Sequence, residues 1–127
     1  ADQSFDLIIA NSVLSHLTLP VAREWLTEMR RLLSPNGLAL LSYHGDFSAT
    51  NMFSRHRQMF ETVLETGFNA DLRASELDEQ IGDREYYRQT FMSDAFAKTM
   101  MGDYFSVEEQ LVGRVSRYQN IAVLRKK

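Results

Sequence analysis

Apolar residues form two short continuous runs in the first third of the chain, with a helical pattern between them. The run from Phe5 to Asn11 has almost no polar alternation, which is typical of a buried strand in a parallel sheet. From Pro20 the apolar positions fall on one helical face, and the Ser-Pro-Asn-Gly sequence at 34–37 has the residues of a turn. The second run spans 38–43. Strand, helix and strand with short connections predict a βαβ unit with parallel strands.

The rest of the chain predicts two helices and a terminal hairpin. A helical pattern extends from about Ala49 to Thr66, and Gly67 is placed to end it. Ser93 predicts the N-cap of a short helix. Residues 105–113 and 119–125 have the pattern of two antiparallel strands joined by a turn. Between Gly67 and Thr90 the periodicity stops, and an irregular stretch of this length is typical of a lid, a binding loop or a disordered segment.

Composition narrows the class of protein. With 127 residues, 44% of them hydrophobic and 24% charged, the chain suits one globular domain. No apolar run approaches the roughly 20 residues that cross a bilayer, and no secretory signal is evident, so we expect a cytoplasmic protein without membrane partners. The absence of cysteine and the isolated histidines predict no metal site.

Charge is unevenly distributed along the chain. The segment 67–90 holds six acidic residues and three arginines, so its net charge of −3 equals that of the whole sequence. A nucleic-acid-binding domain needs a basic face, so this distribution argues against nucleic-acid partners.

Several short motifs in a fixed order carry a family resemblance. Phe5-Asp6 opens an apolar strand, His16 lies in the loop after it, and Arg-Leu-Leu-Ser-Pro-Asn-Gly at 31–37 leads into the second strand. Further motifs are Tyr-His-Gly at 43–45, Tyr-Tyr before Phe and Ser at 86–93, and Gln-Asn before an apolar strand at 119–125. Together they resemble the second half of a class I S-adenosylmethionine-dependent methyltransferase, in a bacterial subgroup that modifies small metabolites or polysaccharides. Asn36 and Asn120 depart from the glycine and aspartate usual in that family.

The resemblance implies an α/β fold, a three-layer Rossmann-like methyltransferase fold of which residues 1–127 form the C-terminal part of a single domain. The first two strands would be parallel, the terminal hairpin would add one antiparallel strand at the far edge, and helices would cover both faces. The acidic stretch at about 67–90 would be an irregular insertion. The family's glycine-rich loop is not in this sequence, so we expect this chain alone to be inactive and to bind S-adenosyl-L-methionine weakly or not at all.

By the same resemblance, Ala10, Asn11 and Ser12 would line the methionine part of the cofactor. In open α/β sheets ligands bind outside the carboxyl ends of the strands, where these residues lie. The alternative interpretation is that Asn11 ends a strand and caps a turn.

Four further residues are candidates for the acceptor side. His16 and His44 follow the two strands and would orient or deprotonate the acceptor, because imidazole titrates near neutral pH. Tyr86 and Tyr87 would bind the substrate by closing over it. Each of the four is also open to a structural role, as a loop histidine bonded to backbone or as a ring that anchors the loop.

Two functions follow as expectations. The first is a methyltransferase acting on a small-molecule or sugar-type acceptor, in which the cofactor carries the difficult step and the protein supplies alignment. The second is a non-catalytic remnant or interaction module. The first strand would then present an exposed apolar edge and pair with another copy, most simply as a homodimer.

Overall fold

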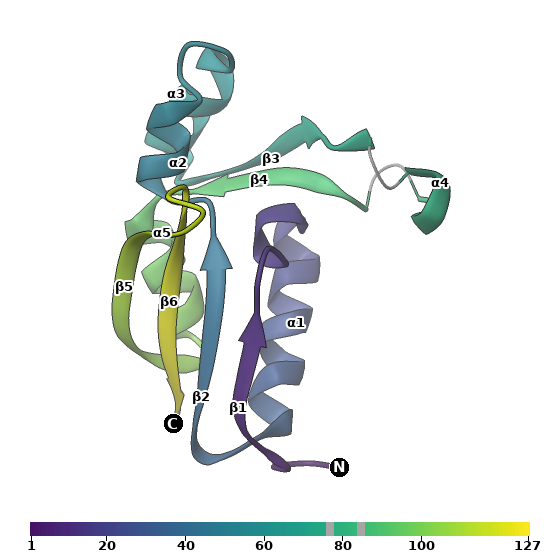
Figure 1. The fold of residues 1–127 in the computed structure, drawn as a ribbon, viewed down its shortest axis with the longest axis vertical. Helices are drawn as coiled ribbons and strands as arrows, with labels where there is room; N and C mark the ends of the chain where they lie inside the picture. The colour runs from purple at the N-terminus through teal and green to yellow at the C-terminus, as the bar shows by residue number, and fades with distance from the viewer. Residues whose placement is uncertain (76–77, 84–85) are drawn as a thin grey trace.

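The computed structural model describes residues 1–75, 78–83 and 86–127 (Figure 1). In chain order its elements are β1 (Phe5–Ala10), the 3-10 helix η1 (Leu14–His16), α1 (Leu19–Leu32), β2 (Leu33–Tyr43), α2 (Asp46–Asn51), α3 (Arg57–Thr66), β3 (Phe68–Arg73), α4 (Asp78–Ile81), β4 (Arg88–Met92), α5 (Asp94–Gly102), β5 (Phe105–Val115) and β6 (Gln119–Lys126).

The main sheet has the strand order β1-β2-β6-β5. The predicted parallel pair is confirmed, with Leu7 opposite Leu38 and Ile9 opposite Leu40. Strand β6 is antiparallel to both of its neighbours, so the antiparallel strand lies inside the sheet and the prediction that it forms the far edge is wrong. The reason is composition: β6 is apolar from Ile121 to Leu124, whereas β5 exposes the charged Glu108 and Glu109, which suit an edge strand.

Strand β2 begins earlier than its apolar run. Phe5 pairs with Leu33 and Leu7 pairs with Leu38, so residues 34–37 bulge out of the ladder. Asn36 adopts φ = +63° in this bulge, a conformation that Asn tolerates better than most residues. The predicted turn is therefore present, but it is built into the strand.

Helices α1 and α5 pack on the same face of the main sheet and share one core. Helix α1 contributes its apolar stripe, of which Leu26 is completely buried and contributes roughly 2 kcal/mol by its burial. The core joins residues from both helices and from β2 and β6: Ala22, Leu26, Met29, Ala39, Leu41, Ala97, Met100, Met101, Ala122 and Leu124. None of the helices in the described part of the chain is long and apolar enough to cross a membrane.

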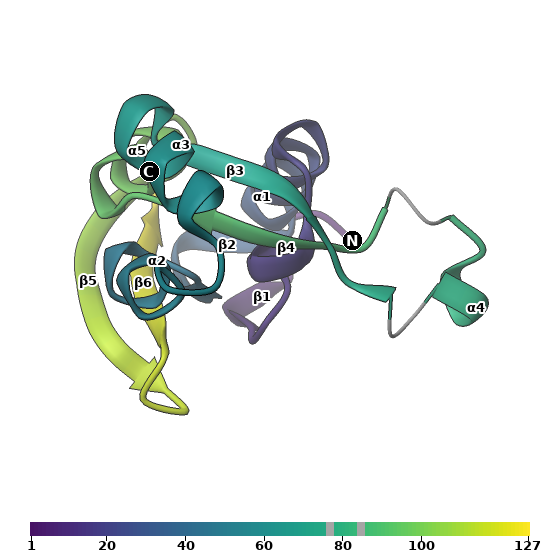
Figure 2. The ribbon, with the colours of Figure 1, turned by 90° about the horizontal axis from the view of Figure 1, so that it is seen from above.

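The opposite face of the sheet differs from the expectation that helices cover both sides. Leu7 and Ile9 of β1 keep 49% and 65% of their surface exposed. Both views show the long helix α1 and helix α5 on one side of the strands (Figures 1 and 2). The α/β class is confirmed, whereas a second helical layer is not formed by the residues that the structure describes.

The acidic stretch expected to be irregular contains a second sheet. Strands β3 and β4 pair antiparallel, with Phe68 opposite Met92 and Asn69 opposite Phe91. Asn69 is buried, and its side chain accepts from the backbone N–H of Asp71, which stabilises a polar residue in the strand. The tip carries the short helix α4, and residues 76–77 and 84–85 of the predicted insertion lie outside the described residues.

The helix predicted over 49–66 is two helices. Helix α2 starts at Asp46 and ends at Asn51, and α3 starts only after His56, whose φ of −137° and ψ of 59° are not helical. Phe53 and Phe60 contact each other across this break, with ring centroids 5.0 Å apart. The predicted N-cap of α5 is confirmed, because the Ser93 side chain accepts from the backbone N–H of Phe96.

Candidate functional site

Three strand termini meet at one end of the main sheet. The carboxyl ends of β1 and β2 lie there beside the start of β6, and the β3–β4 hairpin crosses over them (Figures 1 and 2). His44 extends β2 and forms a bridge to Phe91 of β4, which fixes the hairpin in this place. The candidate residues after both strands therefore lie at this end.

The first group of side chains at this end is a serine–glutamine network, formed by Asn11, Ser12, Ser42 and Gln119. The Ser12 backbone N–H donates to Ser42 Oγ at 2.7 Å, and Gln119 Nε2 donates to Ser12 Oγ at 2.8 Å. The Ser42 hydroxyl is within donating distance of Gln119 Oε1 (2.9 Å) and Asn11 Oδ1 (3.2 Å). These bonds hold Ser12 at φ = +57° and give the strand ends a fixed polar surface.

The second group is a histidine cluster, formed by His16, His44, Tyr87, Phe91 and Tyr118. The His16 ring stacks on Tyr87 with centroids 4.2 Å apart and lies 6.3 Å from the ring of His44. His44 stacks on Phe91 at 4.8 Å and meets the edge of Tyr118 at 5.2 Å. Both predicted catalytic histidines and one of the two predicted tyrosines are thus brought together.

Backbone carbonyls of β4 fix the tautomers of both histidines. His16 Nδ1 lies 2.8 Å from the carbonyl of Arg88, and His44 Nδ1 lies 3.1 Å from the carbonyl of Thr90. A carbonyl oxygen only accepts, so each Nδ1 carries the proton and donates. In its neutral form each ring then presents a lone pair at Nε2, where it accepts a hydrogen bond or a proton.

His44 stays neutral at physiological pH. Burial and, to a smaller extent, the neighbouring His16 lower its pKa to about 4, although the bond to Thr90 opposes this shift. His44 is only 7% exposed, yet the buried side-chain atoms that lack a partner in the described residues are Ser15 Oγ and Asp78 Oδ1. With the proton on Nδ1, Nε2 of His44 is a hydrogen-bond acceptor.

A third group of side chains, formed by Tyr43, Asp46, Asp94 and Asn120, holds the end of β2 in place. Asp94 Oδ1 accepts from Asn120 Nδ2 at 2.9 Å and from the Tyr43 hydroxyl at 3.1 Å, and it also accepts from the Asp46 N–H. Burial, and then the nearby Asp94 charge, raise the pKa of Asp46, while burial raises the pKa of Tyr43. Gly45 lies against this group, so the residue after His44 is held by a tightly packed polar core.

Comparisons with known proteins show which fold this is. Residues 1–41 match the family model described as a methyltransferase domain, and this match covers β1, α1 and most of β2. A Burkholderia thailandensis 1,6-didemethyltoxoflavin-N1-methyltransferase superposes with a TM-score of 0.62 at 13% identity, over 100% of this chain and 46% of that one. The fold is that of the class I methyltransferases.

Two further solved structures support the methyltransferase fold. A protein from Pyrococcus horikoshii OT3 has a TM-score of 0.60 at 17% identity, over 99% of this chain and 53% of that one. A SAM-dependent methyltransferase from Methanosarcina mazei has a TM-score of 0.58 at 20% identity, over 98% and 60%. The chain thus spans about half the length of the structures it matches. No curated protein matches its sequence.

The predicted site residues differ in burial and in the groups that they join. Ala10 is buried at the end of β1, whereas Asn11 is exposed beside it and Ser12 joins the serine–glutamine network. Tyr86 is 36% exposed, and the ring contacts of the described residues link only its neighbour Tyr87 to the cluster. No group of three or more histidines and carboxylates in the described ranges is placed to hold a metal ion.

Ser42, Tyr118 and Gln119 belong to these groups but were not predicted as site residues. Each strand terminus contributes to both groups: Asn11, Ser12 and His16 follow β1, Ser42 and His44 lie at the end of β2, and Tyr118 and Gln119 lie at the start of β6. The available signal was Ser42, a polar residue in the otherwise apolar run 38–43. It indicates a polar neighbour across the sheet.

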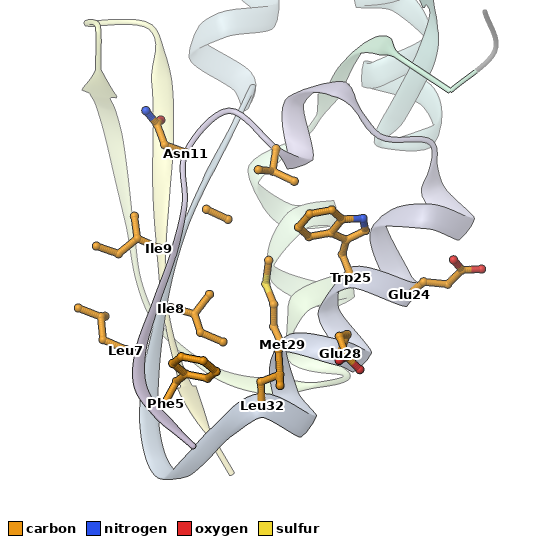
Figure 3. Close-up of a pocket in the computed structure, with 12 residues that line it drawn as sticks. Phe5, Leu7, Ile8, Ile9, Asn11, Glu24, Trp25, Glu28, Met29 and Leu32 are labelled. Carbon is orange, nitrogen blue, oxygen red and sulfur yellow. The ribbon is translucent and has the colours of Figure 1, made fainter. Parts of the chain in front are cut away.

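A groove of about 780 Å³ follows the free edge of β1 and lies apart from the histidine cluster. Figure 3 shows Ile8 facing Met29 and Trp25 of α1, while Leu7 and Ile9 point to the other side of the strand. Its lining reaches Ala10 and Asn11 at one end. The predicted cofactor residues therefore lie where this apolar groove meets the polar strand ends.

Proposed function

We propose that this chain forms one wall of the active site of an S-adenosylmethionine-dependent methyltransferase. The observation that carries the proposal is the arrangement of two groups at the same strand ends, with the serine–glutamine network beside the histidine cluster. A methyltransferase needs a cofactor site next to an acceptor site, and the two groups supply surfaces of different chemistry for them. Asn11 and Ser12 would hold the methionine end of the cofactor.

The polar groups present suit that end of the cofactor. Its ammonium and carboxylate require hydrogen-bond acceptors and donors, and the exposed Asn11 amide offers both. The bound cofactor supplies an activated methyl group, so the protein has to align the acceptor and exclude water. His16 Nε2 would take a proton from the methyl acceptor. His44 Nε2 would accept a second hydrogen bond from the methyl acceptor and so fix the orientation of that molecule.

S-adenosylhomocysteine tests the cofactor site on this chain. We expect the amide NMR signals of residues 10–12 to shift with a Kd on the order of 1 mM. The binding should be this weak because the chain covers only 46% of the Burkholderia thailandensis methyltransferase that it matches. Asn11→Ala should weaken this response, whereas Asn51→Ala, a change at an exposed asparagine in α2, should leave it intact. Uniform small shifts across the chain, or shifts confined to other elements, would contradict the proposal.

A second candidate function, self-association, is favoured by the free edge of β1. This strand pairs only with β2 among the described strands, and exposed Leu7 and Ile9 lie next to its unpaired backbone groups. Such edges pair with another chain, and β1 of a second copy would extend the sheet most simply.

Sedimentation velocity distinguishes this candidate. We expect a concentration-dependent dimer at micromolar concentrations, and Ile9→Lys should shift it to monomer because a charge would enter the new interface. Leu64→Lys is the matched control, since Leu64 on α3 is 69% exposed and Ile9 is 65% exposed. A wild-type chain that stays monomeric would remove the interaction-module hypothesis.

A further inference from the structure

The histidine cluster has the properties of a cation-binding surface. Tyr87 and Tyr118 are half-buried residues beside the two imidazoles, with one face of the Tyr87 ring stacked on His16 and the other not in any described ring contact. The face of a tyrosine ring attracts an ammonium group placed within about 6 Å of its centroid. The rings therefore provide a favourable surface for a positively charged ligand.

The hydrogen-bonding groups of the cluster favour a ligand that donates hydrogen bonds. Nδ1 of His16 and of His44 already donates to a β4 carbonyl, so both rings offer only the Nε2 lone pair. An ammonium group carries N–H donors and no lone pair, which matches two acceptors. A carboxylate or phosphate would bring further acceptors and find no N–H on these rings.

The surrounding charge points the same way. Between Phe68 and Met92 the described residues of the β3–β4 hairpin include four carboxylates and two guanidinium groups, and four minus two gives a net charge of −2; they are Asp71, Asp78, Glu79, Asp83, Arg73 and Arg88. His44 adds no positive charge at neutral pH, because burial lowers its pKa to about 4. The hairpin that carries Tyr87 and Phe91 is therefore acidic over its described residues, and His44 adds no positive charge to it.

We propose that the histidine cluster binds the methyl acceptor as an ammonium ion, so that the acceptor is a primary or secondary amine. This inference rests on the proposed methyltransferase function. One N–H proton passes to His16 Nε2, and the freed nitrogen lone pair forms a bond to the methyl carbon of a sulfonium donor. The carbon–sulfur bond breaks with its electron pair left on sulfur, giving a methylated ammonium and a neutral thioether.

Three probes with one ring and different polar groups test this assignment: benzylamine, benzyl alcohol and benzoate. Each is titrated into the chain at low salt while the imidazole NMR signals of its histidines are followed. We expect benzylamine to shift His16 and His44 with an affinity about fivefold above benzyl alcohol, as a partly desolvated cation–π contact gives. Benzoate should not bind. His56, at the start of α3, is the internal control in the same spectra.

Variants at Tyr87 separate the ring from its hydroxyl. Tyr87→Phe should keep the preference for benzylamine, whereas Tyr87→Leu should lose it, because only the aromatic face attracts the cation. The assignment would be overturned if benzoate bound the wild-type chain as tightly as benzylamine does. It would also be overturned if benzylamine shifted His16 no more than His56, whatever the variants do.

The same titrations distinguish failure of this inference from failure of the proposed function. Shifts of residues 10–12 with S-adenosylhomocysteine but none of His16 with benzylamine would refute the amine class alone. Benzylamine binding without any effect of S-adenosylhomocysteine would refute the methyltransferase proposal, and with it the amine's role as methyl acceptor.

Discussion

Gly45→Ala should destabilise the fold by about 3 kcal/mol, because a methyl group at this position has no room. A Cβ on Gly45 would overlap Asp94 Oδ1 and Asn120 Nδ2, and it would lie 3.0 Å from the Tyr43 ring. These atoms belong to a hydrogen-bonded group, so they cannot move away without breaking its bonds. For a domain of this size the loss corresponds to a fall in Tm of roughly 10 °C, measured by thermal unfolding followed by circular dichroism.

Gly102→Ala is the matched control for this prediction. Gly102 is the last residue of α5, and a Cβ there would meet nothing within 4 Å. Alanine favours the helical conformation over glycine by up to about 1 kcal/mol, so this variant should keep or slightly raise Tm. Equal Tm values for the two variants would show that Gly45 is not closely packed.

The elements that the sequence predicted correctly are those with a continuous or periodic set of apolar residues, although β1, which its pattern predicts to be buried, is mostly exposed. Strand β1, helix α1 and the terminal hairpin carry enough apolar residues for their periodicity to show. The β3–β4 hairpin was missed because it buries the polar Asn69, which is hydrogen-bonded to Asp71, and so its pattern is weak. The break between α2 and α3 was missed because Met52 and Phe53 continue the helical spacing through it.

Only part of the candidate site was predicted: Ser12, His16, His44 and Tyr87 were, whereas Ser42, Tyr118, Gln119 and the arrangement of the groups were not. His16 and His44 follow two parallel strands, and such residues meet at one edge of a sheet. The groups that orient them are the carbonyls of Arg88 and Thr90, and a backbone carbonyl has no sequence signature. The helix patterns likewise showed that α1 and α5 cover a sheet, but not that they cover the same face.

Asn120→Asp should produce the second large effect, and that effect should depend on pH. Asn120 is completely buried and donates from Nδ2 to Asp94 Oδ1, while its Oδ1 accepts from the Gly113 N–H. An aspartate here would replace the donor by an oxygen and face a second carboxylate, with Asp46 close by. The unpaired buried charge should cost on the order of 3 kcal/mol at pH 7.

The sign of the pH dependence follows from the new carboxyl group. Burial and the Asp94 charge would raise its pKa in the folded state above the unfolded value of about 3.9. The folded variant then binds a proton that the unfolded chain releases, so its stability falls as the pH rises above about 4. Urea unfolding at several pH values should show a small difference from wild type below pH 4 and a growing difference above it.

A double variant decides whether charge is the cause. Asn120→Asp combined with Asp94→Asn exchanges the amide and the carboxylate, which restores a donor and an acceptor between residues 94 and 120 and leaves an oxygen at 120 for the Gly113 N–H. The bond from the Asp46 N–H to residue 94 is the one that the exchange gives up. The double variant should therefore recover most of the stability that Asn120→Asp loses at pH 7, and the pH dependence should disappear. A double variant no more stable than Asn120→Asp would mean that Asp94 is not the partner that determines the residue at 120. The arrangement that holds Gly45 and His44 in place would then have to depend on packing rather than on this pair.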